Sequence, residues 1–279
     1  MKYGVVLSGG GVLGAAHIGF FEELEKAGIR SKIVCGTSAG AITGVLYADG
    51  GVEAIKLFYE KIHSTKMFSA KNLILSRHPN NVFAKIESVL RECVKAKTFD
   101  DLKCKFACVA TNIVTGEKVV LDSGDPVSAA MASSAYPGVF PIQKIAGEYL
   151  VDGGITNNFP ASIAKKMGAD VIIGSVLYYL PKIEKEKAEN FPRTAILRRS
   201  LDILQLEQTK KEMILCDFCF LPNLFPYQWY NFDKIVAVRE RGREEARKKM
   251  KNIKEDIKIS RRKRSFWLKN YDSLANIFK

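Results

Sequence analysis

The sequence predicts an α/β fold in which helices flank a central, mostly parallel sheet. Short apolar runs of strand length alternate with helical segments at the start of the chain, in the order strand, helix, strand, helix. That alternation favours parallel strands joined by right-handed crossovers. The length of 279 residues and the 47% hydrophobic content also suffice for a sizeable core in one large domain.

The opening unit consists of two strands and two helices. Val5-Val6-Leu7 is an apolar run with the length of a buried strand, and apolar residues recur at helical spacing from Val12 to Lys26, stopping before Gly28. A second strand is predicted over Ile33 to Cys35, and a helix from Ser38 to about Ala48 follows it. The carboxyl ends of these two strands meet at one edge of the sheet, where α/β proteins bind their ligands.

The rest of the chain continues the alternation. Residues 63–81 are polar with no clear period, and both an irregular connection and a lid over a site fit them. Val114-Thr115-Gly116-Glu117 is typical of a hairpin turn between two strands. The other predicted elements are strands over 105–111, 118–121, 149–151, 171–177 and 218–221, and helices over 52–62, 82–94, 126–134 and 194–215.

One serine is set between two glycines directly after the second predicted strand, in the sequence Gly36-Thr37-Ser38-Ala39-Gly40. A serine at such a strand-to-helix corner is pushed out of the sheet, and the two glycines let neighbouring backbone pass close to it without a Cβ clash. The pattern makes Ser38 a candidate nucleophile. Ordinary glycine-rich turns contain the same pattern by chance, so the other motifs of the chain have to show whether Ser38 is a nucleophile.

A glycine-rich stretch, Gly9-Gly10-Gly11-Val12-Leu13-Gly14, joins the first strand to the first helix. Backbone N–H groups at such a helix start favour negative charge. One interpretation is a dinucleotide site, which requires an acidic residue at the end of the second strand to bind the ribose. That strand ends at Cys35, so we favour an oxyanion hole opposite Ser38, formed by Gly9, Gly10, Gly11 and Val12.

A nucleophilic serine needs a base, and the histidines are poor candidates for it. His17, His63 and His78 all come too early in the chain for the serine, acid, histidine order of α/β hydrolases. Asp152 is better placed, because it ends a predicted strand and is followed by Gly153-Gly154, which lets a substrate approach. The alternative is that Asp152 only caps a turn, as an isolated Asp-Gly usually does.

Taken together, these motifs resemble the patatin-like phospholipases, which are serine acyl hydrolases with a Ser-Asp dyad. The resemblance rests on the glycine loop, the serine elbow and Asp152-Gly153-Gly154 in the expected order, with further blocks at Ala132 to Pro141 and at Asn157-Asn158-Phe159-Pro160. It implies a three-layer α/β sandwich. It also implies a lipid acyl hydrolase, either a phospholipase, a lysophospholipase or an esterase, that needs no cofactor.

The resemblance further implies a role for each residue of the site. Ser38 would attack an ester carbonyl while Asp152 accepts its proton, giving an acyl-enzyme that water hydrolyses. Leu13 departs from the family, which often carries Arg or Lys at this position, and the departure puts a preference for phospholipid headgroups in doubt. The remaining glycines of the three motifs would support the backbone, namely Gly14, Gly36, Gly40, Gly153 and Gly154.

The net charge of +13 is concentrated at the end of the chain. Sixteen Lys and Arg against six Asp and Glu lie after residue 233, a net of +10, which leaves +3 for all that precedes them. We therefore predict a catalytic domain over 1–235 and a basic helical tail over 236–279. The tail contains a candidate apolar stripe, formed by Val236, Val238, Ala246, Met250, Ile253 and Ile257.

The tail also suggests a partner. A basic run followed by aromatic residues suits an anionic membrane surface. A surface helix that packs back on the body fits equally well, and nucleic acid is disfavoured because no recognised motif accompanies the charge. With no leader and no membrane-spanning run in this sequence, we expect a cytoplasmic protein, peripheral at the inner membrane face. The residues of the basic and aromatic patch are Arg261, Arg262, Lys263, Arg264, Phe266 and Trp267.

Two other functions stay open from the sequence alone. One is a nucleotide-binding enzyme that uses the loop from Gly9 to Gly14, and the other is a catalytically weak, membrane-associated adaptor. Cys216-Asp217-Phe218-Cys219 has the C-x-x-C spacing of a metal site, but no second cysteine pair or nearby histidine completes four ligands. We therefore expect no metal.

Overall fold

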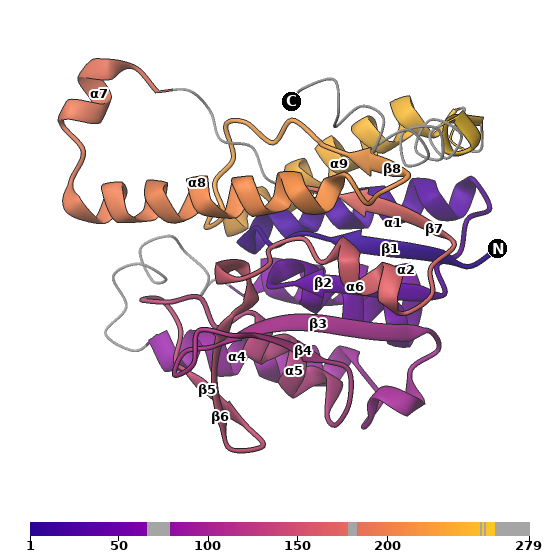
Figure 1. The fold of residues 1–279 in the computed structure, drawn as a ribbon, viewed down its shortest axis with the longest axis horizontal. Coiled ribbons are helices and arrows are strands. Elements are labelled where there is room, and N and C mark those ends of the chain that lie inside the picture. Colours follow the sequence, from indigo (N-terminus) through magenta and orange to yellow (C-terminus); the bar gives the residue numbers. More distant parts are fainter. Residues whose placement is uncertain (66–78, 178–182, 252, 254, 260–279) are drawn as a thin grey trace, which may run out of the picture.

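The computed structural model describes residues 1–65, 79–177, 183–251, 253 and 255–259. Most of the predicted loop over 63–81, and all of the predicted membrane-binding residues from Arg261 to Trp267, lie outside these ranges. In the described part, one sheet of eight strands runs in the order β5-β6-β3-β2-β1-β7-β8, with β4 paired to β3 (Figure 1). The strands are β1 Tyr3–Leu7, β2 Ile33–Thr37, β3 Lys105–Asn112, β4 Lys118–Leu121, β5 Gln143–Ile145, β6 Glu148–Asp152, β7 Val171–Ser175 and β8 Phe218–Phe220.

The centre of the sheet is parallel, as predicted. Strands β3, β2, β1, β7 and β8 all run in the same direction, while β4, β5 and β6 form antiparallel pairs. The antiparallel pair of β3 and β4 confirms the predicted hairpin. The short strand β5 was not predicted, because three residues with no apolar alternation carry too weak a signal.

Helices cover both faces of the sheet, which confirms the three-layer arrangement. Alternate residues of β1 point to opposite faces, so Val5 and Leu7 join one core cluster and Val6 joins another. The first cluster packs against α1, α2, α4, α5 and α9, and the second packs against α6 and the chain after α8. The helices are α1 Ala16–Lys26, α2 Ala39–Ser64, α4 Pro79–Cys93, α5 Pro126–Ser133, α6 Ala161–Lys166, α7 Lys185–Glu189, α8 Arg193–Met213 and α9 Ile235–Met250, with 3-10 turns η1 Gly11–Ala15, η2 Phe99–Asp101, η3 Gly153–Ile155 and η4 Phe232–Lys234.

The two predicted helices, from Ser38 to Ala48 and over 52–62, follow each other directly in the structure and together make up α2. They are joined at Gly51, where φ is 68° and ψ is −158° and the backbone is not helical. A positive φ is readily available only to glycine, so Gly51 marks the end of one helix and the start of the next. No helix among the described residues combines the length and the apolar character that crossing a membrane requires.

Helix α9 corrects the predicted boundary at residue 235, because it belongs to the core and not to a separate tail. Five members of the predicted apolar stripe are buried, while Val236 is 67% exposed. Helix α9 lies against α1, where Arg239 and Arg243 both donate hydrogen bonds to the carboxylate of Glu22. Part of the charge that the sequence assigned to a tail therefore pairs with the body of the protein.

The two helices approach each other through glycines, and this contact gives a stability prediction. A Cβ at Gly242 of α9 would lie 2.1 Å from the carbonyl oxygen of Ala16. Alanine at an unconstrained helix position is more stable than glycine by about 1 kcal/mol, but overpacking costs about 1–3 kcal/mol. We expect Gly242→Ala to lower the free energy of unfolding, measured by urea denaturation. Arg241→Ala, at the half-exposed neighbouring position, serves as the control, and a stabilised Gly242→Ala protein would contradict the close contact.

Candidate active site

Ser38 lies on a sharp corner between β2 and α2. Its φ of 55° and ψ of −123° are unusual for a residue with a side chain and are the mark of a nucleophile elbow. The flanking glycines are required by close backbone contacts. A Cβ at Gly36 would lie 2.2 Å from the carbonyl oxygen of Gly40, and one at Gly40 would lie 2.3 Å from that of Leu7.

The corner is held by hydrogen bonds from two neighbouring segments. The backbone N–H of Ser38 donates to Oγ of Ser133 at 2.9 Å, and this hydroxyl donates in turn to the carbonyl of Val109 at 2.5 Å. On the other side, Thr37 Oγ1 donates to the carbonyl of Asn157 at 2.9 Å. Sequence reasoning placed Ser133 in a short helix but missed this role, since the only signal was its place in a block of small residues.

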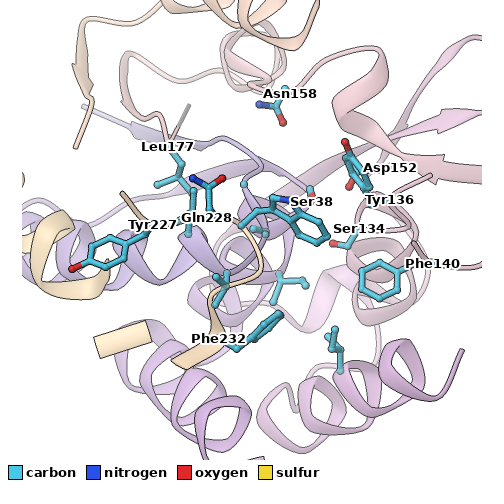
Figure 2. A pocket seen from close by; sticks show the side chains of 18 of the residues that line it. Ser38, Ser134, Tyr136, Phe140, Asp152, Asn158, Leu177, Tyr227, Gln228 and Phe232 are labelled. Atoms are coloured by element: carbon cyan, nitrogen blue, oxygen red, sulfur yellow. The ribbon is translucent and has the colours of Figure 1, made fainter. Parts of the chain in front are cut away.

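Asp152 reaches Ser38 because β6 runs antiparallel to β3. In the strand register Thr37 pairs with Val109, and Asp152 pairs with the next residue of β3, Ala110. The strand thus returns toward the elbow and ends level with it. Figure 2 shows Ser38 in the cavity with Asp152 nearby. Ser38 and Asp152 therefore lie close together because β6 is antiparallel to β3. The sequence predicted a mostly parallel sheet and did not predict the direction of this strand.

The environment of Asp152 suits a proton acceptor. The side chain is buried, its Oδ1 accepts a hydrogen bond from the N–H of Gly154 at 2.7 Å, and its Oδ2 has no hydrogen-bond partner. Burial raises the pKa of Asp152 from 3.8 to about 6, although hydrogen bonding by the Ser38 hydroxyl and the Gly154 amide acts in the opposite direction. Ser38 is therefore close enough to affect the carboxyl, while no bond of ordinary geometry yet reaches Oδ2, as is common before a substrate binds.

The glycine loop corrects part of the predicted oxyanion hole. The N–H of Val12 donates to the carbonyl of Trp229 at 2.8 Å, and the N–H of Gly9 donates to the carbonyl of Asn158 at 3.3 Å. Gly9 and Val12 are thus already engaged, because the loop is fixed by segments far along the chain. The amides of Gly10 and Gly11 donate to no acceptor among the described residues, and both residues line the same cavity as Ser38.

His17 is a core residue and not a base. Its Nδ1 lies 2.9 Å from Oγ of Ser175, its Nε2 lies 3.1 Å from the carbonyl oxygen of Ser8, and burial lowers its pKa to about 4. His63 is exposed at the end of α2, and His78 lies outside the described residues. No histidine among the described residues lines the cavity at Ser38.

The cavity at Ser38 has a volume of about 290 Å³ and a mostly apolar wall. Leu13 lines it, as do aromatic residues of the segment before α9, among them Trp229. An apolar cavity with a few convergent polar groups is the usual form of a small-molecule site. Asn158 adds a buried polar group to this wall, and its Nδ2 has no hydrogen-bond partner. Other apolar lining residues are Phe58, Ile62, Phe83, Ile86, Phe140 and Phe232.

The fold and the site define a three-layer α/β protein with a serine elbow beside a buried aspartate and a glycine loop. A family model described as patatin-like phospholipase matches residues 5–165, which is more than half of the chain. The chain belongs to this family, and the resemblance found in the sequence motifs is confirmed.

Individual relatives agree with this assignment. The chain is 32% identical over 176 residues to a patatin-like phospholipase domain-containing protein of Caenorhabditis elegans, covering 61% of this chain and 13% of that protein. It is 34% identical over 173 residues to lysophospholipase NTE1 of Coccidioides immitis, covering 61% of this chain and 11% of that protein. The chain thus spans about an eighth of the length of these relatives. VipD of Legionella pneumophila is similar with a TM-score of 0.48 at 14% identity, over 89% of this chain and 66% of that one.

Proposed function

We propose that the protein is a lipid acyl hydrolase that cleaves carboxylic esters through a Ser38–Asp152 dyad. The observation that carries the proposal is the buried carboxyl of Asp152, with its raised pKa, beside the elbow serine at an apolar cavity. An apolar cavity suits an acyl chain, since burying each CH₂ group contributes about 0.8 kcal/mol. Membership in a family described as patatin-like phospholipase supports this substrate class.

The reaction begins with proton transfer inside the dyad. As Ser38 Oγ attacks the ester carbonyl, its proton passes to Asp152, whose Oδ2 has no competing partner. The tetrahedral intermediate then collapses, and the proton returns from Asp152 to the departing alcohol oxygen. Water attacks the resulting acyl-enzyme with Asp152 again as base, which releases the fatty acid and restores the serine.

The amides of Gly10 and Gly11 are the donors proposed for the oxyanion. They line the cavity and have no acceptor among the described residues, so a developing negative charge would not have to displace an existing bond. One such donor contributes about 3 kcal/mol to the stability of the transition state. The bond from Val12 to the Trp229 carbonyl, which holds the loop in place, supports their position.

The pH dependence of hydrolysis follows from the raised pKa of Asp152. The carboxylate form is the base, so kcat/KM is expected to be full above pH about 6 and to fall tenfold per pH unit below it. A pH–rate profile with a soluble p-nitrophenyl ester measures this limb, with product quantified at one fixed pH. A profile that stays flat well below pH about 6 would contradict Asp152 as the base.

Covalent labelling tests the proposal directly. A fluorophosphonate probe is expected to modify Ser38, as identified by mass spectrometry of the labelled peptide, and liposome binding without labelling or ester turnover would favour the adaptor function instead. A cytoplasmic location and attachment to an anionic membrane surface stay predictions.

A further inference from the structure

Two asparagines follow each other after the 3-10 turn η3, and their side chains differ in what they bind. Asn157 Nδ2 donates to Oε1 of Glu212 at 3.0 Å, and its Oδ1 accepts a hydrogen bond from the N–H of Phe159 at 3.0 Å. The amide of Asn158 forms no hydrogen bond to a described residue, although this residue is only 3% exposed. A buried polar group without a partner costs about 1–3 kcal/mol of folding free energy, so the protein loses stability by keeping this amide.

The backbone at Asn158 is fixed against both loops of the site. The N–H of Gly9 donates to the carbonyl of Asn158 at 3.3 Å, and Thr37 Oγ1 donates to the carbonyl of Asn157 at 2.9 Å. These two bonds tie the segment to the carboxyl ends of β1 and β2. The Asn158 side chain therefore starts from a fixed point beside the glycine loop and the serine elbow.

The amide of Asn158 lies next to both members of the dyad. A Cβ added at Gly9 would lie 2.5 Å from Oδ1 of Asn158 and 3.0 Å from Cβ of Ser38, so these two atoms flank one point of the glycine loop. A Cβ added at Gly154 would lie 3.0 Å from Oδ1 of Asp152 and 3.3 Å from Oδ1 of Asn158. The oxygen of the amide is thus near the serine and the aspartate, and all three residues line the cavity (Figure 2).

Hydrolysis of the acyl-enzyme needs a water molecule beside Asp152, and both hydrogens of this water need an acceptor. Asp152 Oδ2, which has no partner among the described residues, can take the proton that is lost on attack. The second hydrogen needs an acceptor that holds the water with a lone pair toward the acyl carbon. The carbonyl of an asparagine meets this need without charge, whereas a second carboxylate would raise the pKa of Asp152 further.

We propose that Asn158, together with Asp152, binds the water that hydrolyses the acyl-enzyme and directs it at the acyl carbon. This rests on the proposed Ser38–Asp152 hydrolysis and adds a residue to its second half. The water oxygen bonds to the acyl carbon, one proton passes to Asp152 Oδ2, and the other O–H donates to Asn158 Oδ1. The bond from the acyl carbon to Ser38 Oγ then breaks, and the proton moves from Asp152 to that oxygen as the fatty acid leaves.

Partitioning of the acyl-enzyme between water and hydroxylamine tests this role. Hydroxylamine attacks an ester without a base and gives the hydroxamate, while water gives the fatty acid, so the product ratio depends only on the step after acylation. At a fixed hydroxylamine concentration, we expect the ratio of hydroxamate to fatty acid to rise about tenfold in Asn158→Ala and in Asn158→Leu, as expected for the loss of one hydrogen bond to the attacking water. A p-nitrophenyl ester is the substrate, and Ser38→Ala gives the uncatalysed background.

Stability measurements separate this role from a structural one. Asn158→Leu replaces an unpartnered amide with an apolar group of similar size, so it should not lower the urea midpoint. Asn157→Ala is the matched control from the same segment. It loses the bonds to Glu212 and Phe159, so we expect a lower urea midpoint and an unchanged product ratio.

A product ratio that is unchanged in both Asn158 variants, or that rises equally in Asn157→Ala, would overturn the role of Asn158. If the wild type gives no product above the background, the proposed hydrolysis fails instead. Each ratio is measured within one protein, so a loss of folded material does not imitate the expected change.

Discussion

Ser38→Ala is expected to lower kcat/KM toward carboxylic esters by at least about a thousandfold. Alanine removes the only atom that forms the acyl-enzyme, and catalytic groups that act as a unit lose nearly all their effect when one is removed. Initial rates with p-nitrophenyl esters of increasing chain length measure the loss, and fluorophosphonate labelling should disappear in parallel. The substitution leaves the bonds of the corner intact, because the contact to Ser133 uses the backbone N–H of residue 38.

Two controls make this result specific. Ser134→Ala removes a hydroxyl that also lines the cavity but donates to the carbonyl of Ala130 at 2.8 Å, so its activity should stay within a few-fold of the wild type. Circular dichroism and the urea midpoint check that each protein is folded. Undiminished turnover by Ser38→Ala would exclude Ser38 as the nucleophile.

Asp152→Asn is expected to show two large effects of opposite sign. Activity should fall by about a thousandfold, because an amide cannot accept the serine proton. Stability at neutral pH should rise, because the wild-type site keeps a carboxylate buried. An acid with a pKa raised from 3.8 to about 6 contributes stability that is full below pH about 4 and lost as pH rises through about 6. The whole change corresponds to about 3 kcal/mol.

The pH dependence separates this effect from a general gain in stability. Urea unfolding of Asp152→Asn and wild type should differ most above pH about 6 and converge below pH about 4. Asp122→Asn, at an exposed aspartate, is the matched control and should show no such divergence. Equal stabilities of Asp152→Asn and wild type at all pH values would contradict a buried, ionised Asp152. The expected trade of stability for activity is common at active sites.

The elbow and its partner were predictable because their determinants are local. Gly36 and Gly40 are needed for contacts within a few residues of Ser38 or with the end of the neighbouring strand, and such contacts leave a direct trace in the sequence. Asp152 could be named because it ends an apolar run before two glycines. Its arrival beside Ser38 could not be derived, because the direction of β6 depends on pairing with β3 and not on the residues of β6 themselves.

What the sequence did not reveal depends on contacts between distant segments. The sequence predicted that the amide of Val12 is free to bind an oxyanion. In the structure this amide donates its hydrogen bond to the carbonyl of Trp229, which is remote in the chain. The charges of α9 suggested a solvated tail because their partner, Glu22, lies in another helix. In each case the hydrogen-bond partner comes from a distant segment that tertiary packing brings close. Hydrophobic periodicity and charge counts contain no information about such partners.

The order of strands in the sheet bears on whether residues 5–165, which the family model matches, could fold without the rest of the chain. β1, which carries the glycine loop, lies between β2 and β7, and β7 comes after residue 165. The carbonyl that holds Val12 and the helix that packs on α1 come later still. A fragment limited to 5–165 would keep both dyad residues and yet expose the hydrogen-bonding edge of its innermost strand, which invites self-association. We therefore expect that residues 5–165 do not fold as an autonomous unit, because the second half of the chain covers β1 and holds the glycine loop beside Ser38.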